Sequence, residues 1–281
     1  MKNRKEKIKR YGLDGPVDKG FFDSLNLAIS PTGKSSSPSV KLLDTFDWRL
    51  FKNGLVLKRQ SSRFELYSFK SSRVIASGQF RASKGPLFLE DFPEGPVRKE
   101  LSKYISIRAL IPASEYKEQN TVYSVLNDDE KTVARLEYKI ISFGKGEIDS
   151  FYYLALNSLR GYDDEFKTLD SLLGNEGLKA TSEDPYLGIL MTCDRKPGEY
   201  SSKFRLKIDP ATSSAEALRQ ILLHLVSTMK ANEKGISEDI DIEFLHDFRV
   251  ASAGAVKYSR KMNSSDQATD LRASRTEGVV K

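Results

Sequence analysis

Residues 243–251 read EFLHDFRVA and decide how the C-terminal part of the chain is interpreted. Ile242, Leu245 and Phe248 recur every three residues, the spacing at which side chains gather on one face of an α-helix. His246 and Arg249 are also three residues apart and share a neighbouring face. The pattern therefore predicts a helix with one face that packs and another that presents cations.

A second and stronger helix is predicted upstream. Ser213 and Glu216 have the spacing of a capping box, which marks the start of a helix. The apolar stripe that follows is formed by Leu218, Ile221, Leu222, Leu225, Val226 and Met229. Beyond this stripe, Gly235 can adopt the left-handed conformation that ends a helix. The two segments are expected to form a helical hairpin.

The order of these segments, from Ala215 through Met229 to Arg249, resembles the start of the CHAD family of histidine- and arginine-rich helical domains. The resemblance implies that His246 and Arg249 bind inorganic polyphosphate. The family continues with an arginine run and more helices, whereas here a serine-rich polar segment without apolar periodicity follows Ala251. We therefore expect an incomplete helical domain over residues 210–251 and a disordered or frameshifted tail over residues 252–281.

The composition is typical of a soluble protein that can bury a sizeable core, because 39% of the 281 residues are hydrophobic. The sequence has no run of about 18 apolar residues, and its N-terminus lacks the apolar segment of a secretory signal. Cys193 is the single cysteine, which fits a reducing compartment and is expected to be a passive thiol. We expect a cytoplasmic protein that does not enter a membrane.

The net charge of +6 is concentrated at the two ends of the chain. Six basic side chains against Glu6 give residues 1–10 a charge of +5, and six against three give residues 251–281 a charge of +3. The body of the chain therefore carries about −2. Basic ends are more often solvated than bound to nucleic acid, so no nucleic-acid partner is expected.

Alternating polar and apolar residues predict antiparallel strands over residues 41–81. The alternation returns at 121–126 and 131–140, and residues 127–130 are the expected turn of a hairpin. The helices expected in this part of the chain are 97–104, 150–173 and 186–193. The Asp209-Pro210 step indicates a boundary near residue 210.

Four separated segments, at residues 43–58, 126–137, 159–162 and 197–203, resemble the CYTH family in the form that is fused ahead of a CHAD domain. The resemblance implies an α+β fold over residues 41–209, in which an antiparallel β-barrel with flanking helices encloses a triphosphate tunnel. Residues 1–40 are left as an N-terminal segment of undefined fold.

A tunnel of this kind suits polyphosphate because opposing strands can place basic side chains around the phosphates. The candidate phosphate ligands on predicted strands are Lys58, Lys70, Arg108, Lys117 and Arg135. The pattern leaves open whether each faces the interior or water. Glu137 is a candidate ligand for Mg²⁺ or Mn²⁺, and its alternative role is that of a solvated cross-strand partner.

Hydrolytic members of the family carry a Glu-x-Glu-x-Lys motif on the first strand. The nearest match here is residues 6–10, with Lys9 at the position of the second glutamate. The later segment Glu137-Tyr138-Lys139 has one acid and one base where acids are usual. The prediction is noncatalytic binding of inorganic polyphosphate or a related polyanion. The alternatives are a metal-dependent inorganic triphosphatase, an adenylate-cyclase-like enzyme, or a truncated product with little function.

Overall fold

The computed structural model describes residues 7–25, 27–32, 37–143, 150–193, 195–201 and 206–277. It divides into two compact units. The first consists of Met1–Leu43, Gly54–Phe80 and Pro112–Lys196, and the second of Asp44–Asn53, Arg81–Ile111 and Pro197–Lys281. Both units are therefore built from stretches that are far apart in the sequence.

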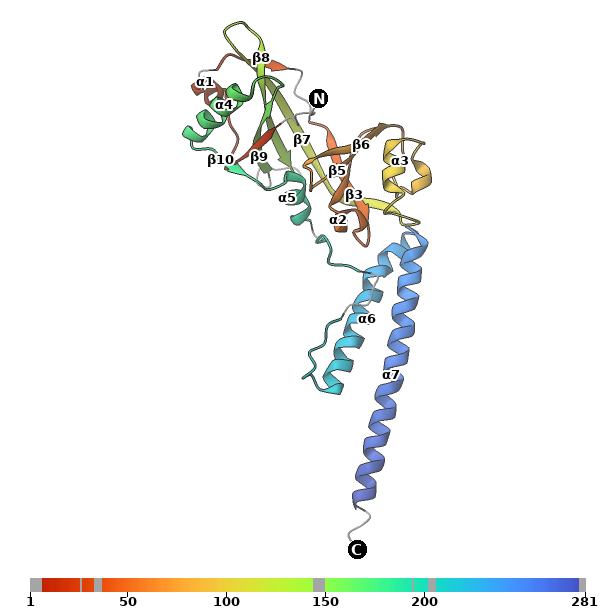
Figure 1. Ribbon diagram of the computed structural model, residues 1–281. Helices are drawn as coiled ribbons and strands as arrows, with labels where there is room; N and C mark the ends of the chain where they lie inside the picture. Colours follow the sequence, from red (N-terminus) through yellow and green to blue (C-terminus); the bar gives the residue numbers. More distant parts are fainter. Residues whose placement is uncertain are drawn as a thin grey trace. The chain divides into compact units, whose positions relative to one another are not determined.

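The first unit is organised around one antiparallel sheet (Figure 1). Its strands are β1 (Ile8–Leu13), β2 (Ile29–Thr32), β3 (Ser39–Thr45), β4 (Leu55–Gln60), β5 (Arg63–Ser68), β6 (Arg73–Gln79), β7 (Leu110–Leu126), β8 (Thr132–Ser142), β9 (Ser150–Ser158) and β10 (Lys179–Thr181). Their order is β10-β1-β9-β8-β7-β3-β4-β5-β6, and β2 also pairs with β7. The α+β class and the strands predicted over residues 41–81 are confirmed.

The predicted hairpin is formed by β7 and β8, with Leu126 opposite Thr132. Its turn is closed by the backbone N–H of Asn127, which donates to the carbonyl of Lys131 at 3.0 Å. The Asn127 side chain accepts from the backbone N–H of Lys131 at 2.9 Å, which is a common way for asparagine to stabilise a turn. The turn therefore fixes how β7 and β8 align.

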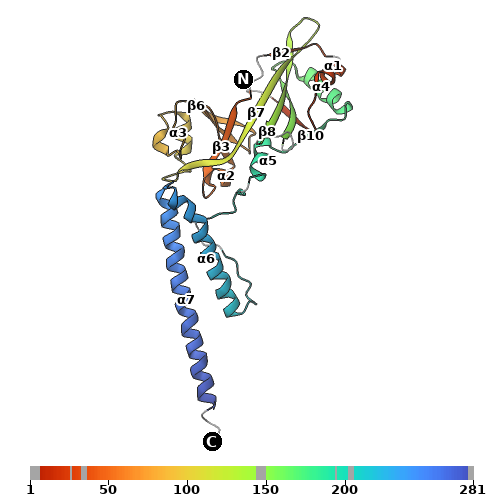
Figure 2. The same cartoon turned by 180° about the vertical axis from the view of Figure 1, so that it is seen from behind.

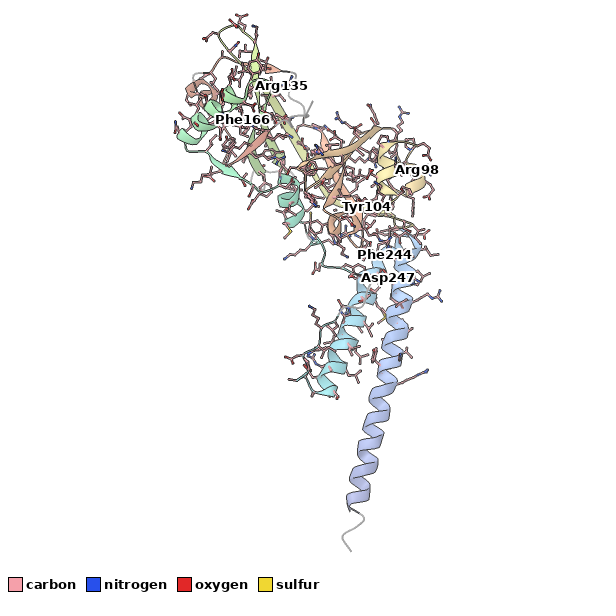
Figure 3. The ribbon with its side chains drawn as sticks, viewed as in Figure 1. Arg98, Tyr104, Arg135, Phe166, Phe244 and Asp247 are labelled. Carbon is pink, nitrogen blue, oxygen red and sulfur yellow. The ribbon has the colours of Figure 1, made fainter. Side chains whose placement is uncertain are left out.

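One face of the sheet packs against α1 (Lys19–Ser24) and α4 (Asp163–Asn175). Leu136 of β8, Leu154 of β9 and Phe166 of α4 lie in this apolar core, and Figure 3 shows Phe166 on its helix. Because the core occupies one face, the alternate side chains of the same strands lie on the other. The helix α5 (Pro185–Met191) also belongs to this unit.

The helix expected over residues 150–173 is wrong in its first part, because residues 150–158 form β9. This strand pairs with β1 on one side and β8 on the other. The run FYYLALN at 151–157 is rich in aromatic and aliphatic side chains, and both faces of a central strand can bury them. A short apolar run of this kind suits a strand or a buried helix equally well.

Part of the segment 1–40 completes the sheet. β1 pairs with β9 and β10, and its Tyr11 is only 1% exposed. β2 pairs with β7. Glu6, the first residue of the candidate first-strand motif, lies outside the described residues.

The second unit contains α2 (Arg49–Lys52), the short 3₁₀ helix η1 (Leu89–Asp91), α3 (Pro96–Leu101), α6 (Ser214–Ser237) and α7 (Ile242–Glu277). The long helices α6 and α7 run antiparallel and side by side, as both Figure 1 and Figure 2 show. Ser213 caps α6 by accepting from the backbone N–H of Glu216 at 3.3 Å, as the capping-box spacing predicts. None of the helices in the described ranges is long and apolar enough to cross a bilayer.

The helical pattern does not end at Ala251, because α7 continues to Glu277. The disordered tail expected over residues 252–281 is not confirmed. Ala251 is 3% exposed, and a side chain added at Gly254 would lie 3.2 Å from Leu225 of α6. The small residues after Ala251 therefore let the two helices approach closely. Small residues carry little hydrophobic signal, so the sequence pattern alone does not reveal this part of the helix.

The packing face of α7 also differs from the prediction. Ile242 and Leu245 are 70% and 44% exposed, whereas Phe244 is 1% exposed. The Phe244 ring lies against the backbone of Gly235, where a methyl group would overlap it. Gly235 is thus a buried residue inside α6 and not its left-handed end; that conformation belongs to Asp239, with φ of 50°.

Candidate functional site

The sheet of the first unit has one apolar face and one polar face. On β8, Tyr138 points into the apolar core, so Glu137 and Lys139 point to the opposite side. Lys139 lies opposite Asn120 of β7 and Tyr153 of β9, so the polar side extends across these strands. We call this side the polar face; its residues are Arg10, Lys58, Glu65, Tyr67, Glu118, Asn120, Glu137, Lys139, Tyr153 and Asn157.

Lys58 of β4 and Glu118 of β7 form a buried ion pair on the polar face. The Lys58 ammonium donates to Glu118 Oε2 at 2.8 Å, and the two residues are 6% and 8% exposed. The hydroxyl of Tyr186 lies 3.3 Å from Lys58 Nζ. A buried pair of this kind adds little net stability, but removing one partner leaves the other charge uncompensated.

Lys139 lies between two carboxylates. Its Nζ is 3.8 Å from Glu118 Oε1 and 3.6 Å from Glu137 Oε2, both longer than an ordinary hydrogen bond. Burial lowers the pKa of Lys139, but the neighbouring Tyr186 and the two carboxylates raise it by more, so the net pKa is above its usual value. Lys139 is therefore a permanent cation at neutral pH whose N–H groups have room for another acceptor.

The tyrosines around these charges remain neutral hydrogen-bond donors. Burial raises the pKa of Tyr153 and of Tyr186 well above the usual value for a phenol. Tyr67 donates to Asp184 at 2.5 Å, and burial together with this bond raises its pKa to about 12. Phenolic hydroxyls that keep their protons can donate to an anion.

The segment before and within α5 brings further groups onto the polar face. Asp184 caps α5 by accepting from the backbone N–H of Tyr186 at 3.0 Å, and it also accepts from Tyr67 of β5. Tyr186, one residue into the helix, reaches Lys58 of β4. These contacts join α5, which follows β10 along the chain, to β4 and β5, which lie towards the other end of the strand path.

A pocket of about 160 Å³ adjoins the polar face. Its lining includes Arg10, Gly12, Phe151, Tyr153 and Gly188. Among the described residues, the guanidinium of Arg10 makes only a long hydrogen bond, 3.4 Å to the hydroxyl of Tyr67. Arginine has five N–H donors, so Arg10 retains capacity to bind an anion.

Two asparagine side chains on the polar face have unused polar atoms. Asn120 Oδ1 and Asn157 Nδ2 are buried and have no hydrogen-bond partner among the described residues. Buried polar atoms are nearly always paired in folded proteins. Unpaired ones on a charged face are therefore candidates for contact with a ligand.

Some of the predicted site residues lie on the polar face, and others lie outside it. Lys58 and Glu137 lie on the polar face. Arg135 lies further along β8 and is exposed (Figure 3), and Lys117 is exposed on the opposite face of β7. The expectation that Lys70 lies on a strand is wrong, because it lies in the exposed turn between β5 and β6, where the alternation of the flanking strands is interrupted.

Arg108 also lies outside a strand, and it belongs to the core of the second unit. It is fully buried, and its guanidinium pairs with Asp247 of α7 and with Asp241, the latter at 3.3 Å. Burial lowers the pKa of Arg108, and the neighbouring aspartates raise it by more. Its charge is thus used to join the start of α7 to the rest of the unit, which a strand pattern could not predict.

His246 and Arg249 are both exposed on α7. Asp247, between them, faces inward and is 7% exposed (Figure 3). The two side chains therefore share an accessible surface of the helix, as their spacing predicts.

Lys9 does not occupy the polar face. It points to the apolar side of β1 and pairs with Asp170 of α4 at 2.5 Å. The residues of β1 on the polar face are Ile8, Arg10 and Gly12, because alternate residues share a face. The assignment of Lys9 to the second glutamate of the first-strand motif is wrong, because the spacing of Glu-x-Glu-x-Lys over residues 6–10 places Ile8 at that position and Arg10 at the lysine.

Sequence reasoning missed Glu118, Asp184 and Tyr186. Asp184 followed by Pro185 is a recognisable start of a helix and could have been found. Glu118 gave no local signal, because its partner Lys58 is 60 residues away. In the described part of the chain, no group of three or more His, Cys, Asp or Glu side chains is arranged to hold a metal ion.

No family model matches the chain, and no curated protein matches it. Among solved structures, it is similar to a candidate adenylate cyclase from Vibrio parahaemolyticus, with 10% identity over 66% of this chain and 98% of the other and a TM-score of 0.38. It is also similar to a candidate adenylate cyclase from Bacillus halodurans, with 16% identity over 65% and 94% and a TM-score of 0.42. Similarity at this level does not bear on activity.

Proposed function

We propose that the polar face binds inorganic polyphosphate, or a related polyanion, without hydrolysing it. The observation that carries the proposal is the convergence of three cations from three strands: Arg10 of β1, Lys58 of β4 and Lys139 of β8. Arg10 has no short hydrogen bond in the described structure, and Lys139 lies beyond hydrogen-bond distance of both its carboxylates. An anion with several charged oxygens could engage all three.

The position of Lys139 supports binding without hydrolysis. Its ammonium lies between Glu118 and Glu137, where a divalent cation bound by both carboxylates would lie. Two positive charges at such a distance repel each other strongly in a partly buried site. β1 adds Ile8 and Arg10 to this face, an apolar group and a cation, and neither is a metal ligand.

The binding test is calorimetric titration with inorganic tripolyphosphate in the absence of divalent metal. We expect Arg10→Gln/Lys139→Gln to weaken binding by about 100-fold, since each charge-assisted bond is worth about tenfold or more. Lys167→Gln, which removes an exposed cation from α4, is the matched control and should bind as the wild type does. Equal binding by all three proteins would contradict the proposal.

The catalytic alternative is tested by phosphate release from tripolyphosphate with Mg²⁺ or Mn²⁺. We expect no release above the level of a protein-free control. Turnover that is lost in Glu137→Ala would establish a metal-dependent triphosphatase and overturn the noncatalytic part of the proposal.

His246 and Arg249 of α7 are proposed as a second polyphosphate contact. Their exposure and shared helical face support this role, because accessible histidine and arginine side chains can donate to phosphate oxygens. The contact is independent of the polar face and has its own test below.

A further inference from the structure

Glu118 makes the contacts that an anionic ligand would need. Its Oε2 accepts from Lys58 at 2.8 Å, and its Oε1 lies 3.8 Å from Lys139. One carboxylate thus bridges two ammonium groups that come from different strands. A phosphate group, with its several charged oxygens, would bridge the same pair in the same way.

The N–H donors of the Lys58 ammonium already have partners in the protein. A lysine ammonium has three N–H groups, and Lys58 directs them towards Glu118 and the hydroxyl of Tyr186. Because Lys58 and Glu118 are both almost fully buried, water cannot easily replace either partner. A ligand must therefore compete with Glu118 for the same two lysines.

We propose that Glu118 is an internal competitor for the anion site and sets the minimum charge that an anion must carry to bind. This inference rests on the proposed function of the polar face. An orthophosphate that displaces Glu118 gains two contacts and leaves a buried carboxylate uncompensated beside it. A longer chain of phosphates can contact Lys139 and Arg10 as well, so it can outweigh the cost of that displacement.

Removing the charge of Glu118 should relax this selectivity. In Glu118→Gln the amide keeps the shape of the side chain and can still accept a hydrogen bond from Lys58. The negative charge that repels the ligand is gone, so tripolyphosphate should bind at least about tenfold more tightly, given the strength of like-charge repulsion at such distances. Orthophosphate, which the wild type excludes, should become a measurable ligand.

The experiment titrates wild type, Glu118→Gln and Glu115→Gln with tripolyphosphate and with orthophosphate by calorimetry. Glu115 is the matched control, because it lies on the same strand but outside the polar face. Its carboxylate pairs with the ammonium of Lys41 at a distance of 3.1 Å. Tighter tripolyphosphate binding and new orthophosphate binding in Glu118→Gln alone would support the inference. Unchanged or weaker binding in Glu118→Gln, with normal binding by the wild type, would overturn it and leave the proposed function intact.

Two other results separate the inference from the function on which it rests. If Glu118→Gln binds tripolyphosphate and the wild type does not, Glu118 excludes the anion and the proposed function is wrong. If neither protein binds, both proposals are wrong. Should Glu118→Gln fail to fold, Lys58→Met/Glu118→Met removes both buried charges together, and it should gain orthophosphate binding through Lys139 and Arg10; no gain would overturn the inference.

Discussion

The backbone of Gly235 in α6 lies against the ring of Phe244 in α7 so closely that no side chain fits between them. Phe244 is 1% exposed and also contacts Phe46, with ring centroids 4.5 Å apart. The ring therefore has little room to move away. The contact between these two residues fixes how closely the two helices of the second unit approach each other.

We expect Gly235→Ala to lower the free energy of unfolding by about 1–3 kcal/mol, because the added methyl group overlaps a buried ring. Gly174→Ala in α4 is the control, since nothing lies within 4 Å of its added methyl group. That variant should be neutral or stabilising by up to about 1 kcal/mol, as alanine favours helix. Urea denaturation measures the unfolding free energy of both variants. A neutral Gly235→Ala would show that the helices can separate at no cost.

Lys58→Met should destabilise the first unit by about 3–5 kcal/mol, because it leaves the buried Glu118 without its partner. Lys58→Met/Glu118→Met should recover most of this loss. The control is Lys41→Met, whose partner Glu115 is exposed, and it should cost less than about 1 kcal/mol. Chemical denaturation of the wild type and the three variants measures these differences in unfolding free energy. Similar losses in Lys58→Met and Lys41→Met would contradict the prediction.

Stability should fall at alkaline pH through Tyr67. Its pKa is raised to about 12 in the folded protein by burial and by its bond to Asp184, against about 10 in an unfolded chain. The stabilisation is therefore fully present below pH 10 and is lost as the pH rises towards 12, by about 2 kcal/mol. Tyr67→Phe should show a shallower decline when unfolding free energy is measured from pH 9 to 11.5. Identical slopes would exclude Tyr67 as a cause.

His246→Ala/Arg249→Ala should weaken binding of long-chain polyphosphate and leave stability within about 0.5 kcal/mol of the wild type, because both side chains are exposed. Lys257→Ala removes another exposed cation from α7 and serves as the control. Titration with polyphosphate distinguishes the three proteins. Unchanged affinity in the double variant would exclude this surface of α7.

The sequence predicts well those features that depend on neighbouring residues. The β7–β8 hairpin follows from alternation on both sides of a turn, and the start of α6 follows from the capping box at Ser213. α7 beyond Ala251 was missed because small residues that pack closely carry no hydrophobic period. β9 was missed because a buried strand and a buried helix have similar composition.

The candidate site was only partly predictable for a different reason. Lys58 and Glu137 could be selected as charged residues on strands, but whether they face inward depends on strand pairing. The partnership of Lys58 with Glu118 requires side chains of β4 and β7, which lie on either side of β3 in the sheet, to meet across 60 residues of sequence. Arg108 was misplaced because its aspartate partners lie more than 130 residues away, in a different kind of element.

Each compact unit is assembled from three separate stretches, so the polypeptide passes between the units five times. No single cut separates the two units from each other, because residues 44–53 and 81–111 of the second unit lie between stretches of the first. A fragment that begins at Pro197 would lack Arg108 and would leave Asp241 and Asp247 without the cation that neutralises them. A single truncation therefore cannot isolate one unit from the other, and dissecting this chain requires point substitutions in the full-length protein.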